Sequence, residues 1–332
     1  MEHCIKCGLP KTYPKIKMDQ EGVCCFCRFY EKHQQNLDDY NSLHRQFLAE
    51  IEKAKEKARK NHAPYDCIVG LSGGKDGAYL ICQLRKVYGM RVLAYTFDNG
   101  FSTDFGRQNC ERLKKAMDID HIYISMKDSE LRKFYRAALK VTRNFCSICF
   151  HFMHYHSHLL ASRFGIPLIV NGRTRSQIYQ NACEEKGLEP FELSHSLKEF
   201  EYQMFGRLLD KLDGQSCVDF LPEAEVTSLS YFTYHQVTDE EKMAYLEKEI
   251  GWERPKNAKP HADCWAHEAA EKLFLDKNGF PLRTGELAQM VRSKELSPEK
   301  AEEILLEDRR LYDSPDPALM ARFYERVGMK PL

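Results

Sequence analysis

One glycine-rich segment of the sequence has the residue types that bind a phosphate. A buried strand predicted at residues 67–71 runs directly into the segment SGGKDG, and a helical pattern follows as far as Tyr88. Adjacent glycines let the backbone approach an anion closely, and the amide groups at the start of a helix point towards it. We therefore predict that this loop binds the phosphates of a nucleotide through Ser72, Gly73, Gly74, Lys75, Asp76 and Gly77.

The loop matches neither G-x-x-x-x-G-K-[ST] nor G-x-G-x-x-G, which disfavours the corresponding triphosphatases and dinucleotide folds. Two further loops follow predicted strands and belong to the same rim. Asp98 follows the second strand, where it serves either as a turn residue or as a nucleotide or Mg²⁺ ligand. Gly172 and Arg173 follow the fourth, and Arg173 and Arg175 either bind pyrophosphate or a charged substrate or are plain surface charges.

Two C-x-x-C pairs lie in a first segment that is too short to build its own core. Four thiolates on two such knuckles complete a tetrahedral Zn²⁺ site, and the metal then supplies folding free energy. We predict a zinc ribbon whose ligands are Cys4, Cys7, Cys24 and Cys27, with Cys25 as the spare thiol.

A third pair, Cys146 and Cys149, falls between the third and fourth predicted strands, and Cys264 is the best additional ligand because it lies in a loop before a helix. Three cysteines leave one iron of a [4Fe-4S] cluster open to a ligand such as sulfide. Alternatively, Cys146 and Cys149 carry a persulfide and resolve it as a disulfide. A third reading is that these cysteines only pack in the core. We assign catalytic roles to Lys75, Asp76, Cys146 and Cys149.

The elements that must position these residues alternate along the chain, which predicts a doubly wound parallel sheet of the α/β class. Ligands of such sheets bind beyond the carboxyl ends of the strands. The predicted strands are 67–71, 91–97, 121–125 and 167–171, and the predicted helices are 77–88, 105–117, 131–143 and 150–164. Further helices are expected near 198–212 and from Asp239 onward, with a strand or an irregular segment at 226–234.

The pattern divides the chain into four parts: a zinc-ribbon module at 1–29, one long linking helix at 30–62, the nucleotide-binding domain at 63–236 and a C-terminal helical segment at 237–332. Lys plus Arg equals Asp plus Glu at 49 each, so no net field recruits nucleic acid. The start of the sequence has no apolar core, and no later run reaches the roughly 18 apolar residues of a membrane span. We therefore expect a cytoplasmic protein with no membrane contact.

The loop resembles the signature S-G-G-x-D-S of the PP-loop ATP pyrophosphatases, with Gly77 in place of the final serine. That superfamily adenylates a substrate oxygen and releases pyrophosphate. The resemblance implies an adenine nucleotide alpha hydrolase-like fold, with ATP and Mg²⁺ as cofactors and AMP as the leaving group.

Over most of the chain the pattern is also similar to the N-acetyl sugar amidotransferase branch of these enzymes. The matching stretches are 4–27 with EGVC at 21–24, the loop at Ser72, GIPLI at 165–169, Gly251-Trp252, HADC at 261–264 and Val291-Arg292. The pair Cys146 and Cys149 instead resembles the iron-sulfur tRNA thiolation enzymes, which combine an amino-terminal zinc module, the same loop, a C-x-x-C and a later cysteine.

The favoured function is adenylation of a substrate oxygen followed by its replacement with sulfur, dependent on an iron-sulfur cluster or a persulfide. One alternative is an amidotransferase that places glutamine-derived ammonia on an N-acetyl sugar; the other is a non-enzymatic zinc protein that binds nucleic acid. The substrate is a small molecule or a tRNA. A sulfur donor or a separate glutaminase is the expected partner, and the helical tail offers a face for a homodimer.

Overall fold

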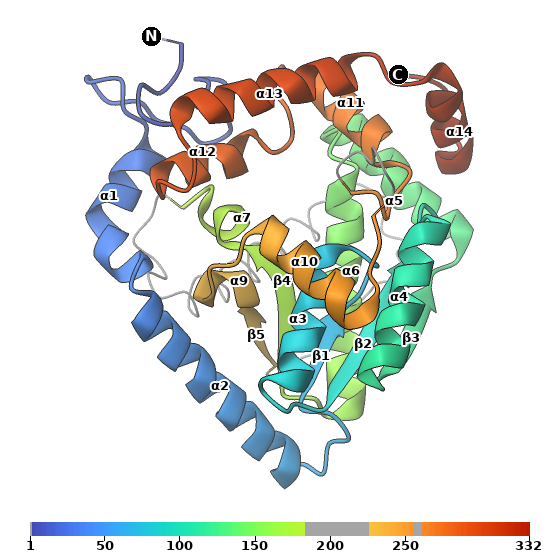
Figure 1. Ribbon diagram of the computed structural model, residues 1–332. Helices are drawn as coiled ribbons and strands as arrows, with labels where there is room; N and C mark the ends of the chain where they lie inside the picture. The colour runs from blue at the N-terminus through green and yellow to red at the C-terminus, as the bar shows by residue number, and fades with distance from the viewer. Residues whose placement is uncertain (1, 183–225, 255–260) are drawn as a thin grey trace.

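The fold centres on a five-stranded parallel sheet, shown in Figure 1 with helices on both faces. The computed structural model describes residues 2–182, 226–254 and 261–332. The strand order is β3-β2-β1-β4-β5, and the strands are β1 (Cys67–Gly70), β2 (Val92–Asp98), β3 (Asp120–Ser125), β4 (Leu168–Thr174) and β5 (Thr227–Ser230). β2 and β3 lie on one side of β1, and β4 and β5 lie on the other. The predicted doubly wound α/β class is therefore confirmed.

The central strands are apolar because both faces of the sheet are covered. Cys67 and Val69 of β1 pack into one core with Phe47 and Leu80, whereas Ile68 points to the other face and packs with Ala161. The covering helices are α3 (Lys75–Lys86), α4 (Asp104–Met117), α5 (Asp128–Val141), α6 (Cys146–Phe164) and α10 (Asp239–Ile250). The short helices α7 (Arg175–Tyr179) and α9 (Tyr231–Tyr234) follow β4 and β5.

The prediction of one long linking helix is wrong. The chain forms α1 (Cys25–Leu37) and α2 (Tyr40–Lys60), which meet at an angle in Figure 1. The Asp39 side chain accepts a hydrogen bond from the Ser42 amide at 3.0 Å and thereby caps the start of α2. Asp38 pairs with Arg175 of α7, so a tertiary ion pair holds the junction that helical periodicity alone does not reveal.

The C-terminal segment is helical, as predicted. It contains α11 (His267–Asn278), α12 (Thr284–Arg292), α13 (Pro298–Asp313) and α14 (Pro317–Val327). Ser297 and Asp316 cap the proline-led helices, and Gly328 ends α14 with a φ of 68°. In Figure 1 these helices span from the cysteine-rich segment at the N-terminus to α5.

Two sequence-based expectations need a separate statement. The helix predicted near residues 198–212 lies outside the described residues. Within the described ranges, no helix combines the length and the apolar character that a membrane crossing requires.

Candidate functional site

The loop at residues 72–77 lies at the carboxyl end of β1 and leads into α3. Gly74 takes the extended N-cap position, and its amide donates to Ser72 Oγ at 3.3 Å. Gly73 has a φ of 89°, and a side-chain carbon there would lie 2.0 Å from the carbonyl oxygen of Gly106. Trp252 Nε1 donates to the carbonyl oxygen of Gly73 at 3.0 Å. The loop is therefore fixed between α4 and Trp252, which lies two residues after the end of α10.

The neighbouring strand β4 closes the other side of the loop. A side-chain carbon at Gly172 would lie 3.2 Å from Asp76 Cβ, so the two backbones approach closely. The sheet order changes direction between β1 and β4, and this is the point at which doubly wound sheets bind ligands. The structure thus brings Gly172 and the loop together, as the sequence predicts.

Two residues of α10 that the sequence analysis missed complete this site. Lys242 Nζ contacts Asp76 Oδ1 at 2.7 Å and Asp239 Oδ1 at 3.1 Å. Lys75 Nζ contacts the other oxygens of the same carboxylates, at 3.1 and 3.3 Å. Two lysines and two aspartates therefore alternate in one closed network. Its signal in the sequence is weak, because Asp239 and Lys242 resemble an ordinary i, i+3 pair at a helix start.

The charges of this network are set by burial and by the partners. Burial lowers the pKa of Lys75, but the carboxylates of Asp76 and Asp239 outweigh it and hold that pKa above its ordinary value. Burial likewise raises the pKa of Asp239, but the ammonium groups of Lys75 and Lys242 outweigh it and keep that pKa low. Both groups stay charged at neutral pH, and Lys75 keeps the positive charge that a phosphate requires.

The remaining rim residues take different roles. Asp98 Oδ1 accepts a hydrogen bond from the Gly100 amide at 2.9 Å, which is a turn interaction. The guanidinium of Arg173 lies over the Phe150 ring at 4.7 Å. Arg175 is buried with 4% of its surface exposed, so it is not a plain surface charge. The roles of Asp98 and Arg173 towards a nucleotide stay predictions.

A steric constraint explains why residue 77 of this chain is a glycine. A side-chain carbon at Gly77 would lie 2.8 Å from the carbonyl oxygen of Gly70 in the central strand. We therefore expect Gly77→Ser, which restores the residue of the S-G-G-x-D-S pattern, to lower the melting temperature by several degrees, as an overpacking cost of about 1–3 kcal/mol implies. A serine variant as stable as the wild type would contradict this reason.

The four cysteines of the first segment form a compact, buried group. Their sulfur atoms all lie within 4.8 Å of one another, with Cys4 Sγ 3.8 Å from Cys27 Sγ and Cys7 Sγ 3.6 Å from Cys24 Sγ. Zn–S bonds of about 2.3 Å at the tetrahedral angle place two sulfurs about 3.8 Å apart. The donor set fits a zinc ion, and it is the one such group of His, Cys, Asp or Glu within the described ranges.

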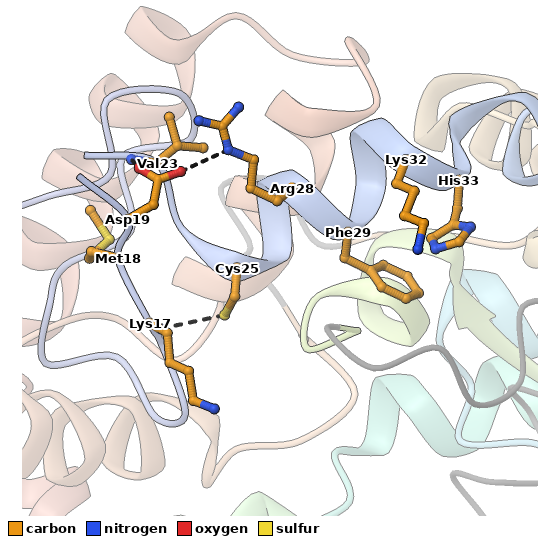
Figure 2. Close-up of a pocket in the computed structure, with 9 residues that line it drawn as sticks. All are labelled: Lys17, Met18, Asp19, Val23, Cys25, Arg28, Phe29, Lys32 and His33. Atoms are coloured by element: carbon orange, nitrogen blue, oxygen red, sulfur yellow. Dashed lines mark hydrogen bonds and ion pairs between the residues drawn. The ribbon is translucent and has the colours of Figure 1, made fainter. Parts of the chain in front are cut away.

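Groups outside the four ligands also contact their sulfurs. The Cys24 amide donates to Cys4 Sγ at 3.3 Å, and Arg292 Nη1 of α12 donates to Cys7 Sγ at 3.5 Å. Such donors stabilise thiolates bound to a metal. Cys25 instead accepts from the Lys17 amide at 3.4 Å and faces a hollow of about 420 Å³, shown in Figure 2. Cys25 is therefore outside the ligand group.

The three remaining candidate cysteines border one aromatic core. Cys146 and Cys149 lie in the first turn of α6, and all three pack against the cluster that contains Phe101 and Phe145. Burial raises the pKa of each thiol, and the charge of Cys149 raises the pKa of Cys146 and of Cys264 further. The tertiary structure thus brings Cys264 near the C-x-x-C pair.

Cys149 has two polar neighbours that the sequence analysis did not identify. Asn99 Nδ2 donates to Cys149 Sγ at 3.6 Å, and the Tyr135 hydroxyl lies 3.6 Å from the same sulfur. The Tyr135 hydroxyl also donates to the carbonyl oxygen of Asn99 at 2.9 Å. Asn99 directly follows β2, which pairs with β1, so this contact lies at the same edge of the sheet as the loop at residues 72–77.

The chain around Cys264 links this cluster to the loop. Ser102 forms an isolated bridge with Cys264, and the Thr103 amide donates to the carbonyl oxygen of Asp263 at 3.0 Å. A side-chain carbon at Gly74 would lie 3.5 Å from Asp263 Oδ2. The candidate sulfur ligand Cys264 therefore directly follows a residue whose side chain touches the loop at residues 72–77.

Comparisons with known sequences give two relatives. No protein-family model matches the chain. An uncharacterised protein of Methanocaldococcus jannaschii is 21% identical over 305 residues, which cover 91% of this chain and 93% of that protein. The glutamine-hydrolysing GMP synthase of Pyrobaculum aerophilum is 27% identical over 121 residues, which cover 36% of this chain and 23% of that enzyme.

Comparison with solved structures gives matches to three enzymes. The U34-tRNA thiolase NcsA of Methanococcus maripaludis, solved with its [4Fe-4S] cluster, has a TM-score of 0.39 and 15% identity, over 95% of this chain and 89% of that one. The NH3-dependent NAD synthetase of Campylobacter jejuni has a TM-score of 0.36 and 13% identity, over 89% and 98%. The NMN synthetase of Francisella tularensis has a TM-score of 0.33 and 15% identity, over 79% and 96%.

These three neighbours are PP-loop ATP pyrophosphatases, the superfamily whose loop signature residues 72–77 resemble. The TM-scores are low. The roles assigned below therefore rest on the described residues of this chain.

Proposed function

We propose that this chain is an ATP-dependent enzyme that adenylates a substrate oxygen and then replaces that oxygen with sulfur. The observation that carries the proposal is the position of the phosphate loop. It lies at the β1/β4 switch point, with Lys75 held in its charged form and a half-buried set of three cysteines close by in the fold. A nucleotide and a sulfur donor would thus meet at one edge of the sheet.

In the first step the substrate oxygen attacks the α phosphorus of ATP. The bond between the α phosphorus and the bridging oxygen breaks, and pyrophosphate leaves with the electron pair. The loop amides and the ammonium of Lys75 stabilise the negative charge that develops on the leaving group. Mg²⁺ supplies further charge neutralisation when it is bound. Asp76 and Asp98 are the carboxylates that would hold it.

In the second step a sulfur nucleophile attacks the activated carbon and AMP leaves. Cys146, Cys149 and Cys264 would hold the sulfur source, either on a [4Fe-4S] cluster or as a persulfide on Cys149. In the persulfide version the outer sulfur bonds to the substrate, Cys146 then displaces it from Cys149, and an external thiol reduces the resulting disulfide.

Asn99 and Tyr135 would orient Cys149 in either version. The Tyr135 hydroxyl has one proton and two neighbours, the carbonyl oxygen of Asn99 and Cys149 Sγ. With a neutral thiol, that proton stays on the carbonyl oxygen. With an anionic sulfur, the proton turns to the sulfur and Asn99 Nδ2 adds a second donor.

Nitrogen transfer is the second candidate, because the sequence match to a glutamine-hydrolysing GMP synthase favours it. The first step would be the same, and ammonia from a separate glutaminase would replace the sulfur nucleophile. In that case the three cysteines would have no chemical role. The substrate in both cases is a small molecule or a tRNA, and the chain is proposed to work in the cytoplasm.

A Cys149→Ser variant tests the sulfur step separately from nucleotide binding. After anaerobic reconstitution we expect the wild type to hold iron and acid-labile sulfide, and the variant to lose most of both because one of three ligands is gone. Both proteins should bind MgATP with the same affinity by calorimetry. Ser147→Ala is the matched control, because the Ser147 hydroxyl donates to the carbonyl oxygen of Asn144.

Three results would decide between the versions. A wild type that never holds iron removes the cluster version, and cyanide-releasable sulfur on Cys149 would then support the persulfide. A wild type with neither iron nor releasable sulfur, yet with glutamine-dependent AMP formation, would support nitrogen transfer. Absence of MgATP binding would overturn the function as a whole.

A further inference from the structure

The guanidinium of Arg175 lies buried where α7 meets the junction of α1 and α2. Its Nη2 atom donates to Asp38 Oδ1 and to the Tyr30 hydroxyl, the latter at 3.3 Å. The rings of Tyr40 and Tyr179 lie 5.2 and 5.3 Å from its central carbon. These contacts fix the position of the group, but they use only one of its three nitrogen atoms.

Three buried donors in this cluster have no hydrogen-bond partner among the described residues. They are Arg175 Nε, Arg175 Nη1 and the Tyr179 hydroxyl, each with less than 1 Å² of exposed surface. Folded proteins leave few buried polar groups unpaired, because each loses its bonds to water without replacement. Arg175 and Tyr179 lie one helical turn apart, and their shared lack of partners indicates a binding site for a group that brings acceptors.

The chemistry of the donors defines that group. Burial raises the pKa of Tyr179 far above neutral pH, against the opposing effect of Arg175, so the hydroxyl keeps its proton. Arginine has no acceptor atom. Asp38, the carboxylate that faces Arg175, is 30% exposed and contacts the Nη2 atom, so it does not cover the other two nitrogens. The complement is an anionic oxygen group.

The cluster lies a short distance from the phosphate loop along β4. Gly172 touches Asp76, and Arg175 follows three residues later, about 10 Å away along an extended chain. Thr174 bridges to Phe232 of α9, whose ring lies 4.0 Å from Lys242 Nζ. Arg175 and the loop at residues 72–77 therefore both follow the carboxyl ends of the paired strands β4 and β1, at the same edge of the sheet.

We propose that Arg175 and Tyr179 form a substrate subsite for an anionic oxygen group, a carboxylate or a phosphate. This inference rests on the proposed adenylation and narrows its substrate to an acidic molecule. A bound anionic group would also explain why the charged side chain of Arg175, directly after the end of β4, is buried.

The test compares two tyrosines that flank the same guanidinium. In the nucleotide-free protein, Tyr179→Phe is expected to raise the melting temperature, because it removes an unpaired buried hydroxyl without changing the ring. Tyr30→Phe should lower it, because the Tyr30 hydroxyl donates to Asp38 Oδ1 at 2.7 Å. Acetate, malonate and inorganic phosphate are then titrated against chloride at equal ionic strength.

We expect at least one of the three anions to stabilise the wild type, and Tyr179→Phe to weaken the apparent affinity about tenfold. Stabilisation by acetate or malonate would identify a carboxylate as the ligand. Phosphate can also bind the loop at residues 72–77, so its effect at this subsite is measured as the difference in stabilisation between the wild type and Tyr179→Phe. Three outcomes overturn the subsite: a Tyr179→Phe protein destabilised as much as Tyr30→Phe, equal anion affinity in wild type and Tyr179→Phe, or no stabilisation by any of the anions. MgATP binding, measured separately, reports on the adenylation proposal alone.

Discussion

Replacing Lys75 with alanine is expected to weaken MgATP binding by about 10- to 100-fold, the effect of losing one charged hydrogen bond to a phosphate. The ammonium of Lys75 lies at the start of α3 and keeps its charge through Asp76 and Asp239. The fold should tolerate the change, because Lys242 still contacts both carboxylates. Isothermal calorimetry gives the affinity, and the melting temperature shows whether the variant is folded.

Lys86→Ala provides the matched control for this result. Lys86 ends the same helix, 11 residues and about 16 Å from Lys75, and pairs with Glu249 on the surface. We expect it to leave the nucleotide affinity unchanged. Equal affinities for Lys75→Ala and the wild type would mean that the loop does not contact the phosphates.

Removing the metal from the first segment is expected to unfold that segment. Apparent binding free energies of structural zinc are about 10–16 kcal/mol in small zinc-binding units, so the ion contributes most of their folding free energy. A Cys27→Ala variant, or the wild type treated with a strong chelator, should lose about one equivalent of zinc. Residues 2–24 should then become sensitive to proteolysis.

The effect should extend to the helical tail. Phe280 and Ala288 pack in the same apolar cluster as the four cysteines, and Arg292 donates to Cys7 Sγ. Hydrogen exchange in α11 and α12 should therefore rise when the zinc is lost. Cys25→Ser is the control, since Cys25 lies outside the ligand group, and it should keep its metal. A Cys27→Ala protein with unchanged metal content and unchanged exchange would exclude the zinc ribbon.

The residue pattern predicted those features that depend on neighbours in the sequence. Strand and helix alternation identified the parallel sheet, because apolar runs and helical periods are local properties. The proline-led helices of the tail were marked by Ser297 and Asp316 for the same reason. The prediction of one continuous linking helix failed, because the junction at Asp38 is held by Arg175, 137 residues later in the chain.

The candidate site divides in the same way. The glycines and Lys75 of the loop, and the two C-x-x-C pairs of the first segment, act through spacings of a few residues, which the sequence alone determines. The tertiary structure alone placed Lys242 on Asp76, across 166 residues, and Asn99 on Cys149. It also buried Arg175 instead of exposing it. Such contacts depend on how strands and helices pack, and a charged or polar side chain carries no local mark of the partner that packing will bring to it.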